Sequence, residues 1–183
     1  VFPSADASLE TAQEEKFDLV CRKLGLEPGM RLLDVGCGWG GMVMHAVKHY
    51  GVTAIGVTLS EQQARYGQET IESAGLTSQA QIRFSDYHDV PESGFDAVSS
   101  IGLTEHIGRA NYPAYFSFLY GKLRDEGRML NHTITRPNDG WTTHFKKSFI
   151  DRYVFPDGEL TGSSQVMTAM NTAGFEVRHE ENL

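Results

Sequence analysis

The residues with the clearest chemical potential lie in a glycine-rich segment that follows an apolar stretch. Residues 32–41 read Leu-Leu-Asp-Val-Gly-Cys-Gly-Trp-Gly-Gly, with one acid before the glycines. Glycines at such a turn allow positive φ and let the backbone come close to a ligand, while the amides of a following helix point toward it. The segment predicts a cofactor-binding loop. The spacing of Gly36, Gly38 and Gly41 also satisfies the dinucleotide fingerprint, so it does not by itself name the cofactor.

The strand that follows argues against a dinucleotide. A dinucleotide site needs a carboxylate about 20 residues further on to hold the ribose hydroxyls, whereas the strand predicted at 53–57 ends in Thr58-Leu59-Ser60. Asp34 would repel a pyrophosphate, but it could meet the amino or carboxyl end of a phosphate-free cofactor. We therefore expect S-adenosylmethionine rather than NAD. The alternative is that Asp34 only caps a turn beside structural glycines.

A carboxylate and an imidazole stand side by side after the fourth predicted strand, at Glu105 and His106. Beside a sulfonium cofactor, the carboxylate could neutralise developing positive charge or hold a base, and the imidazole could orient it or carry a proton. The alternative is a glutamate that starts a helix, with a histidine packed behind it. His132 ends the fifth predicted strand, where an ordinary structural histidine is the competing interpretation.

Two further side chains could contact the cofactor. Gln63 could reach an adenosine hydroxyl, although residues 60–63, Ser-Glu-Gln-Gln, also have the pattern of a helix-capping box. Tyr87 follows Asp86 in the loop after the third predicted strand. It could lie on or beside an adenine ring, or be an ordinary, partly exposed aromatic residue.

Apolar periodicity and turn residues predict alternating helices and strands. One helix is expected over residues 9–24 and is closed by Glu27-Pro28-Gly29, a second runs from the glycine loop to about residue 50, a third opens at residues 60–63, and a fourth covers 112–123. Strands are expected at 31–35, 53–57, 80–84, 94–101 and 128–133. This alternation implies a Rossmann-like α/β fold with a mostly parallel sheet and helices on both faces. Ligands then bind at the carboxyl ends of the strands, where the chain order reverses. Beyond Arg136 the pattern weakens to helices near 149–153 and 164–173 and a strand at 175–179.

The 183 residues suit a single domain. With 24 acidic and 16 basic residues the net charge is -8, which disfavours nonspecific binding to nucleic acid or to an anionic membrane. Lys146, Lys147 and Arg152 could form a basic patch, but a solvated face is the simpler explanation. Cys21 and Cys37 lack metal-ligand spacing and are expected as reduced thiols. Since neither a membrane span nor a signal-peptide pattern is found, a cytoplasmic location is expected.

Several segments carry a family resemblance. They are residues 33–41, residues 56–63, Glu-His-Ile-Gly at 105–108 with Asn111-Tyr112, His-Thr-Ile at 132–134, and residues 149–158, which include Tyr-Val-Phe-Pro-Asp-Gly. Taken together and in order, they resemble the family of cyclopropane-fatty-acyl-phospholipid synthases and mycolic acid cyclopropane synthases. The glycine loop is common to many methyltransferases, but the Thr-Leu-Ser turn and the last segment are more specific.

The resemblance implies the class I methyltransferase fold and transfer of the methyl group of S-adenosylmethionine to a cis double bond of a phospholipid acyl chain. The resulting carbocation must be kept from water and deprotonated, a step in which the family is expected to use bicarbonate. The resemblance assigns bicarbonate to Glu105, His132 and the backbone at Ile101, with His106 as a neighbouring candidate. The cofactor candidates are Asp34, Gly36, Cys37, Gly38, Thr58, Leu59, Gln63, Asp86 and Tyr87.

The sequence also departs from the family. A cysteine and a tyrosine that the family places near bicarbonate match positions before Val1 and after Leu183, so the chain is expected to be a core that lacks native terminal segments. A methyl- or methylene-branched product, a homo-oligomer and peripheral contact with the inner face of a membrane stay open. The alternatives are an N-methyltransferase of a small amine and an inactive S-adenosylmethionine-binding module, with an oxidoreductase least favoured.

Overall fold

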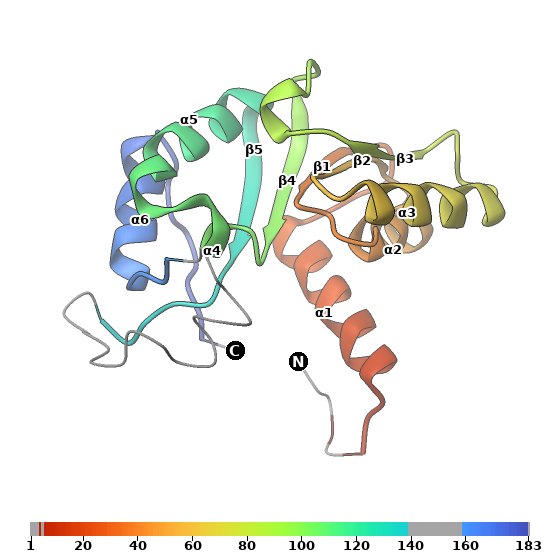
Figure 1. Ribbon diagram of the computed structural model, residues 1–183, viewed down its shortest axis with the longest axis horizontal. Coiled ribbons are helices and arrows are strands. Elements are labelled where there is room, and N and C mark those ends of the chain that lie inside the picture. Colours follow the sequence, from red (N-terminus) through yellow and green to blue (C-terminus); the bar gives the residue numbers. More distant parts are fainter. Residues whose placement is uncertain (1–3, 5, 139–158, 183) are drawn as a thin grey trace. The chain divides into compact units, whose positions relative to one another are not determined.

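The computed structural model describes residue 4, residues 6–138 and residues 159–182 (Figure 1). These residues form two compact units. One holds the residues up to 101 together with 122–131, and the other holds 102–121 and the residues from 132 to 182. The expectation of a single domain stays a prediction. The helix expected near 149–153, the basic patch and the resembling segment 149–158 lie outside the described residues.

The first unit holds a five-stranded sheet, apart from the last residue of its fifth strand. The strands are β1 (Arg31–Val35), β2 (Thr53–Thr58), β3 (Ala80–Phe84), β4 (Phe95–Ile101) and β5 (Leu123–His132), in the order β3-β2-β1-β4-β5. β1 pairs in parallel with β2 and β4, and β2 pairs in parallel with β3. The chain order therefore reverses between β1 and β4, as expected for a ligand-binding sheet.

Three helices belong to the first unit, α1 (Leu9–Leu24), α2 (Gly41–Tyr50) and α3 (Glu61–Ser73), with a 3-10 turn η1 (Tyr87–Asp89). α1 packs against α2, and α2 and α3 pack against the strands. The Ser8 side chain caps α1 by accepting a hydrogen bond from the Thr11 amide. The predicted closure of this helix at residues 27–29 is wrong, because Gly25 adopts φ 62° and ends it earlier.

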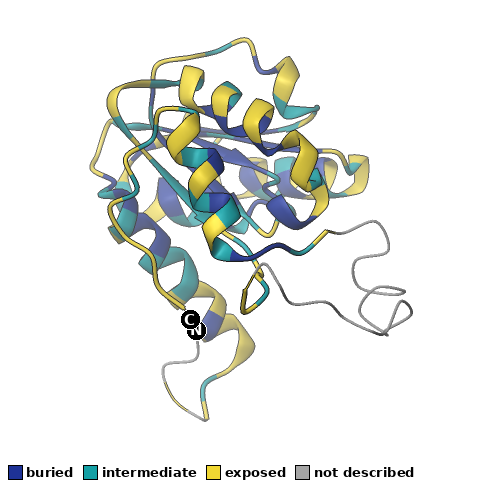
Figure 2. Ribbon diagram, turned by 90° about the vertical axis from the view of Figure 1, so that its left-hand side faces the viewer, coloured by how far each residue is buried: buried dark blue, intermediate teal, exposed yellow. Residues whose placement is uncertain are grey.

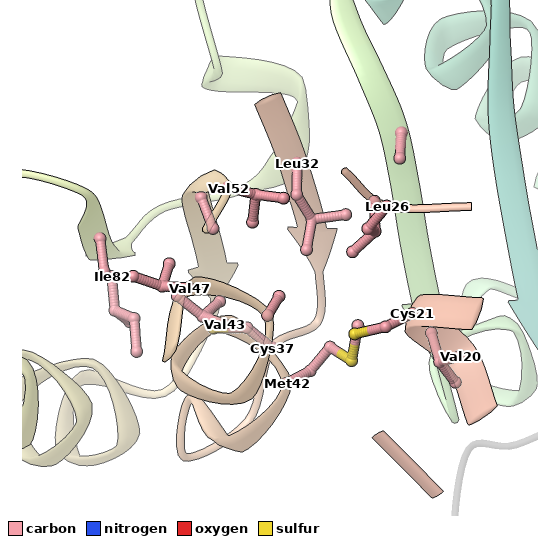
Figure 3. Close-up of a cluster of buried hydrophobic side chains, with 14 of the residues drawn as sticks. Val20, Cys21, Leu26, Leu32, Cys37, Met42, Val43, Val47, Val52 and Ile82 are labelled. Carbon is pink, nitrogen blue, oxygen red and sulfur yellow. The ribbon is translucent and has the colours of Figure 1, made fainter. Parts of the chain in front are cut away.

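The core of the first unit gathers buried side chains from its helices and strands (Figure 3). Buried and exposed residues alternate along its helices (Figure 2). In α2, Met42, Val43, Ala46 and Val47 are buried, while Lys48 is exposed. Met42 and Val43 follow directly on the glycine loop. Their burial therefore fixes the start of α2, and with it the loop, against the sheet.

The second unit contains α4 (Thr104–Ile107), the 3-10 turn η2 (Arg109–Asn111), α5 (Tyr112–Lys122) except its last residue, and α6 (Ser163–Thr172). Its aromatic core includes Tyr115 and Phe116 of α5, with ring centroids 5.1 Å apart. The predicted strand at 175–179 is wrong. Phe175 packs edge-on against Tyr120 at 5.2 Å, and residues 175–182 have no regular secondary structure.

β5 begins at residue 123 rather than at the expected 128, and it ends at His132. Arg124, Asp125 and Glu126, followed by Gly127, have the composition of a turn, which hides the first half of the strand in the sequence. Among the described residues, no helix is both long enough and apolar enough to cross a membrane.

Candidate functional site

The glycine loop between β1 and α2 has three residues with positive φ, namely Gly36 (74°), Gly38 (55°) and Gly40 (85°). The amides of Gly36 and Cys37 both donate to the carbonyl of Val57 at 3.0 Å, which ties the loop to the end of β2. A Cβ built on Gly38 would meet no atom within 4 Å. The open side of the loop, where a ligand can approach the backbone, therefore lies at Gly38.

Cys37 points into the core instead of toward this open side. Its side chain is 8% exposed, and a Cβ on Gly56 of β2 would lie 2.9 Å from its Sγ atom. Burial raises the pKa of the Cys37 thiol, and burial likewise raises the pKa of the Cys21 thiol to about 12. Both cysteines are free and buried. Neither thiol is therefore suited to react, and any contact of Cys37 with a cofactor would rest on its backbone.

Asp34 is buried in β1, with 2% of its surface exposed. Its Oδ1 atom accepts a hydrogen bond of 2.6 Å from the Ser99 hydroxyl on β4. Burial raises the pKa of the carboxyl to about 6, whereas the bond from Ser99 and the positive charge of Lys16 act in the opposite direction. The carboxylate thus bonds to the neighbouring strand and not to the glycine turn that it was alternatively expected to cap.

The turn after β2 organises Thr58, Leu59 and Gln63. The Thr58 hydroxyl donates to Oε1 of Gln63 at 2.7 Å, while Ser60 caps α3 by accepting from the Gln63 amide at 3.3 Å. Half of the predicted capping box is therefore present, because the Gln63 side chain bonds to Thr58 instead of the Ser60 amide. Leu59 is 70% exposed. An exposed leucine beside a fixed hydroxyl–amide pair is suited to one face of a nucleoside.

The loop after β3 contains Asp86 and Tyr87. Oδ1 of Asp86 accepts hydrogen bonds from the backbone amide and from Nδ1 of His88, at 2.9 and 2.8 Å, so this carboxylate caps η1. The Tyr87 ring is half-buried and stacks on the His88 ring at 4.0 Å. Since β1, β2 and β3 are parallel neighbours, the structure brings the loops that carry all the predicted cofactor residues to one edge of the first unit.

In the second unit, Glu105 is the central feature. It lies in α4 with 2% of its surface exposed, and its Oε1 atom accepts a hydrogen bond of 2.7 Å from the Ile134 amide. Its buried Oε2 atom has no hydrogen-bond partner among the described residues. Removing a carboxylate oxygen from water without a partner is costly. The arrangement therefore points to a donor that is not part of the described chain.

The other predicted catalytic residues differ in placement. The carbonyl of His132 accepts from the Gly102 amide at 2.9 Å, and its side chain is exposed. His106 is also exposed, so the alternative of a histidine packed behind Glu105 is wrong. Ile101, whose backbone was expected to hold bicarbonate, is partly buried at the end of β4. The backbone amide that bonds to Glu105 is that of Ile134.

Residues that the sequence did not single out surround Glu105. The Glu159 amide donates to the Glu105 carbonyl at 3.0 Å, and the Glu159 carboxylate accepts from the Arg109 amide at 2.9 Å. The hydroxyl of the buried Tyr112 lies 3.4 Å from the Thr104 carbonyl. The resembling segments included Ile134 and Tyr112 without giving them a role, whereas no signal in the sequence indicated Glu159.

The two units have different chemical capacities. The first unit offers an open backbone loop, an exposed apolar residue and a buried acid, which suit an adenosine-containing cofactor. The second unit offers a buried carboxylate with one oxygen that no described residue bonds to, which suits a hydrogen-bond donor or a cation. In the part of the chain that the structure describes, no group of three or more histidine, cysteine or acidic side chains could hold a metal ion.

Comparisons with known proteins agree on one family. The family model described as mycolic acid cyclopropane synthetase matches residues 1–183. A probable fatty acid methyltransferase of Mycobacterium tuberculosis is 62% identical over 182 residues, which are 100% of this chain and 42% of that protein. The cyclopropane-fatty-acyl-phospholipid synthase of Escherichia coli is 38% identical over 159 residues, 87% of this chain and 40% of that protein.

A solved structure matches the fold. The crystal structure of a mycolic acid cyclopropane synthase complexed with SAH and CTAB superposes with a TM-score of 0.87 at 36% identity, covering 97% of this chain and 66% of that chain. The present chain spans less than half the length of the two curated relatives described above.

Proposed function

Because the chain belongs to the mycolic acid cyclopropane synthetase family, which confirms the resemblance and the class I methyltransferase fold, we propose that it forms part of a lipid-modifying enzyme. The enzyme transfers the methyl group of S-adenosylmethionine to a cis double bond of an unsaturated phospholipid acyl chain. The product is a cyclopropane or a methyl- or methylene-branched chain. The observation that carries the proposal is the buried Glu105, whose Oε2 atom has no partner among the described residues.

The residues of the first unit fit the cofactor. An added Cβ at Gly38 would occupy the open side of the loop, where the cofactor would lie against the loop backbone. The exposed Leu59 and the half-buried Tyr87 offer apolar surfaces for the adenosine group, and Gln63 offers a polar one. Asp34 offers a negative charge for the ammonium group of the methionyl part. Its raised pKa, about 6, means that it is ionised at neutral pH and gains from a cation.

Bicarbonate also fits the residues present. Its hydroxyl is a donor, and Oε2 of Glu105 is a buried acceptor to which no residue of the described ranges donates. The imidazole of His132, two residues before Ile134, would provide a second polar contact. When bound, S-adenosylmethionine supplies an electrophilic methyl group and bicarbonate supplies a proton acceptor.

The protein's own part in the reaction follows from Glu105. The Ile134 amide fixes the carboxylate in one orientation, so no reorganisation is needed when positive charge develops on the acyl chain. Burial excludes water, which would otherwise trap a carbocation. The Glu159 amide holds the backbone of the same residue. Substrate access would require peripheral contact with a membrane or a lipid carrier.

The test is lipid mass spectrometry of cells that produce the intact protein. We expect unsaturated phospholipid acyl chains to gain the mass of one CH2 unit, and S-adenosylmethionine with a labelled methyl group should transfer the label. Resistance of the product to hydrogenation that reduces alkenes distinguishes a ring from a methylene branch. In the labelled assay with purified intact protein, vesicles whose phospholipids carry only saturated chains are the matched control and should take up no label.

Other outcomes have definite meanings. Labelled product on a small amine, with none on lipid, would replace the proposal by an N-methyltransferase. Binding of S-adenosylhomocysteine without transfer to any acceptor by the intact protein would favour a binding module.

A further inference from the structure

α1 meets the glycine loop through two adjacent residues, Lys16 and Phe17. A Cβ built on Gly41, the first residue of α2, would lie 2.7 Å from Cζ of the Phe17 ring, so this ring occupies the space next to the loop. The Lys16 ammonium lies 4.7 Å from the centroid of the same ring. A lysine of α1 is therefore placed beside the loop that the cofactor would use.

Polar contacts of Asp18, two residues after Lys16, help to hold α1 against α2. Oδ1 of Asp18 accepts a 2.6 Å hydrogen bond from the hydroxyl of Tyr50, at the end of α2, and Oδ2 of Asp18 pairs with Arg22 at 2.8 Å. α1 also packs on α2 along the apolar side that includes Val20 and Cys21 (Figure 3). Lys16 therefore projects from a supported helix, as a binding residue requires.

Lys16 is a partly buried basic residue. Its side chain is half-buried, and apart from the aromatic contact its Nζ atom makes no hydrogen bond or ion pair with any described residue. Burial lowers its pKa, and the charge of Asp34 opposes this effect; reciprocally, Lys16 favours the ionised form of Asp34. A half-buried ammonium without a hydrogen-bond acceptor is suited to an anionic ligand group.

We propose that Lys16 binds the carboxylate of the methionyl group of S-adenosylmethionine, while Asp34 faces its ammonium group. This inference rests on the proposed function, because it takes the cofactor to be S-adenosylmethionine. The methionyl group is a zwitterion, and the glycine loop is flanked by one buried acid and one half-buried base of opposite sign. Lys16 is thus a cofactor-binding residue that favours a methionyl group with a carboxylate over the same group without it.

The experiment compares two probes by calorimetry, S-adenosylmethionine and decarboxylated S-adenosylmethionine, which keeps the ammonium group but lacks the carboxylate. The purified wild-type protein should bind the first more tightly by about tenfold to a hundredfold, the value of a hydrogen bond between charged groups. In Lys16→Met this preference should disappear, because only the affinity for the carboxylate-bearing probe falls. Lys16→Arg should keep part of it. Lys48→Met, an exposed lysine of α2, should keep all of it.

Each result decides between distinct readings. Equal weakening of both probes in Lys16→Met would mean that Lys16 acts only through Asp34, and it would overturn the inference, as would an unchanged preference. Wild-type protein that binds both probes equally would also overturn the inference. This result needs no variant, so the inference can be tested even if Lys16→Met does not fold. Wild-type protein that binds neither probe would instead remove the proposed function itself.

Discussion

The hydroxyl of Ser99 on β4 donates a 2.6 Å hydrogen bond to the carboxylate of Asp34 on β1. Both residues are buried, and Asp34 lies opposite Ser99 in the parallel register of these strands. A buried acid with one hydroxyl partner is poorly compensated for the loss of water. The site therefore holds a carboxylate that is more costly to the free protein than an isosteric neutral group would be.

Asp34→Asn should stabilise the protein above pH 6. The pKa of Asp34 is raised from 3.8 to about 6 by burial, so between these values the unfolded chain loses its proton first and the wild type becomes less stable as pH rises. Below pH 3.8 both states are protonated and this penalty is absent. Urea denaturation should show the variant's advantage in free energy of unfolding to be larger at pH 8 than at pH 4, by about 2 kcal/mol.

The exposed Asp125 provides the control. Asp125→Asn should show no such dependence on pH, and an equal shift in both variants would contradict the burial argument. Asp34→Asn should also lose affinity for S-adenosylmethionine, since the charge that opposes the ammonium group is gone. Stability and cofactor binding would then change in opposite directions.

Glu105→Gln should lower methyl transfer by about 100-fold while leaving affinity for S-adenosylhomocysteine unchanged. The amide keeps an oxygen that can accept from the Ile134 amide, so the fold is retained while the negative charge is lost. Steady-state turnover of the intact protein, with calorimetry of the same sample, measures both effects. Glu69→Gln, on the exposed side of α3, is the matched control. Full turnover in Glu105→Gln would refute the role given to this carboxylate.

Gly38→Leu should abolish binding of S-adenosylhomocysteine. The new side chain would project into the open side of the loop, where no protein atom lies within 4 Å of its Cβ. The residue also has φ 55°, which costs a non-glycine residue about 1–2 kcal/mol.

Gly75→Leu separates these two effects. Gly75 follows α3 with φ 69° and equally open space, but it is not part of the glycine loop. We expect a similar loss of stability, measured by thermal unfolding, and full affinity. Retained affinity in Gly38→Leu would show that the cofactor does not approach the loop at this residue.

Gly56→Ala should destabilise the protein by about 1–3 kcal/mol, since the added Cβ would lie 2.9 Å from atoms of Cys37 and Val43. Gly121→Ala, in α5, meets no atom within 4 Å and should be neutral or stabilising by up to about 1 kcal/mol. Denaturant unfolding of the two variants measures the contrast. Equal stability would mean that α2 can move away from β2 without cost.

Most of the fold was predictable because periodic burial leaves a strong pattern. β1 and β3 have the predicted limits, α2 ends at Tyr50 as predicted, and the α/β alternation gives the parallel sheet. The errors fall where local composition misleads. The acids and glycine of residues 123–127 hide the start of β5, and the apolar–polar alternation of residues 175–179 resembles a strand although Phe175 packs against an aromatic side chain.

Less of the candidate site than of the fold could be predicted from the sequence. The glycine loop is local and was recognisable, but the side-chain direction of Cys37 depends on its contact with Gly56. The bond from Thr58 to Gln63 competes with a capping pattern that the sequence equally allowed. Ile134 and Glu159 hold Glu105 through backbone amides, and a backbone amide carries no signature in the residue type.

Those two amides lie 29 and 54 positions after Glu105 in the printed chain. During synthesis on a ribosome, the acid emerges long before either of its anchors. A nascent chain that stops short of residue 159 would already carry its glycine loop, yet its acid would lack one anchor. During synthesis, the chain should therefore become able to bind the cofactor before it can hold the Glu105 carboxylate in the orientation that methyl transfer needs.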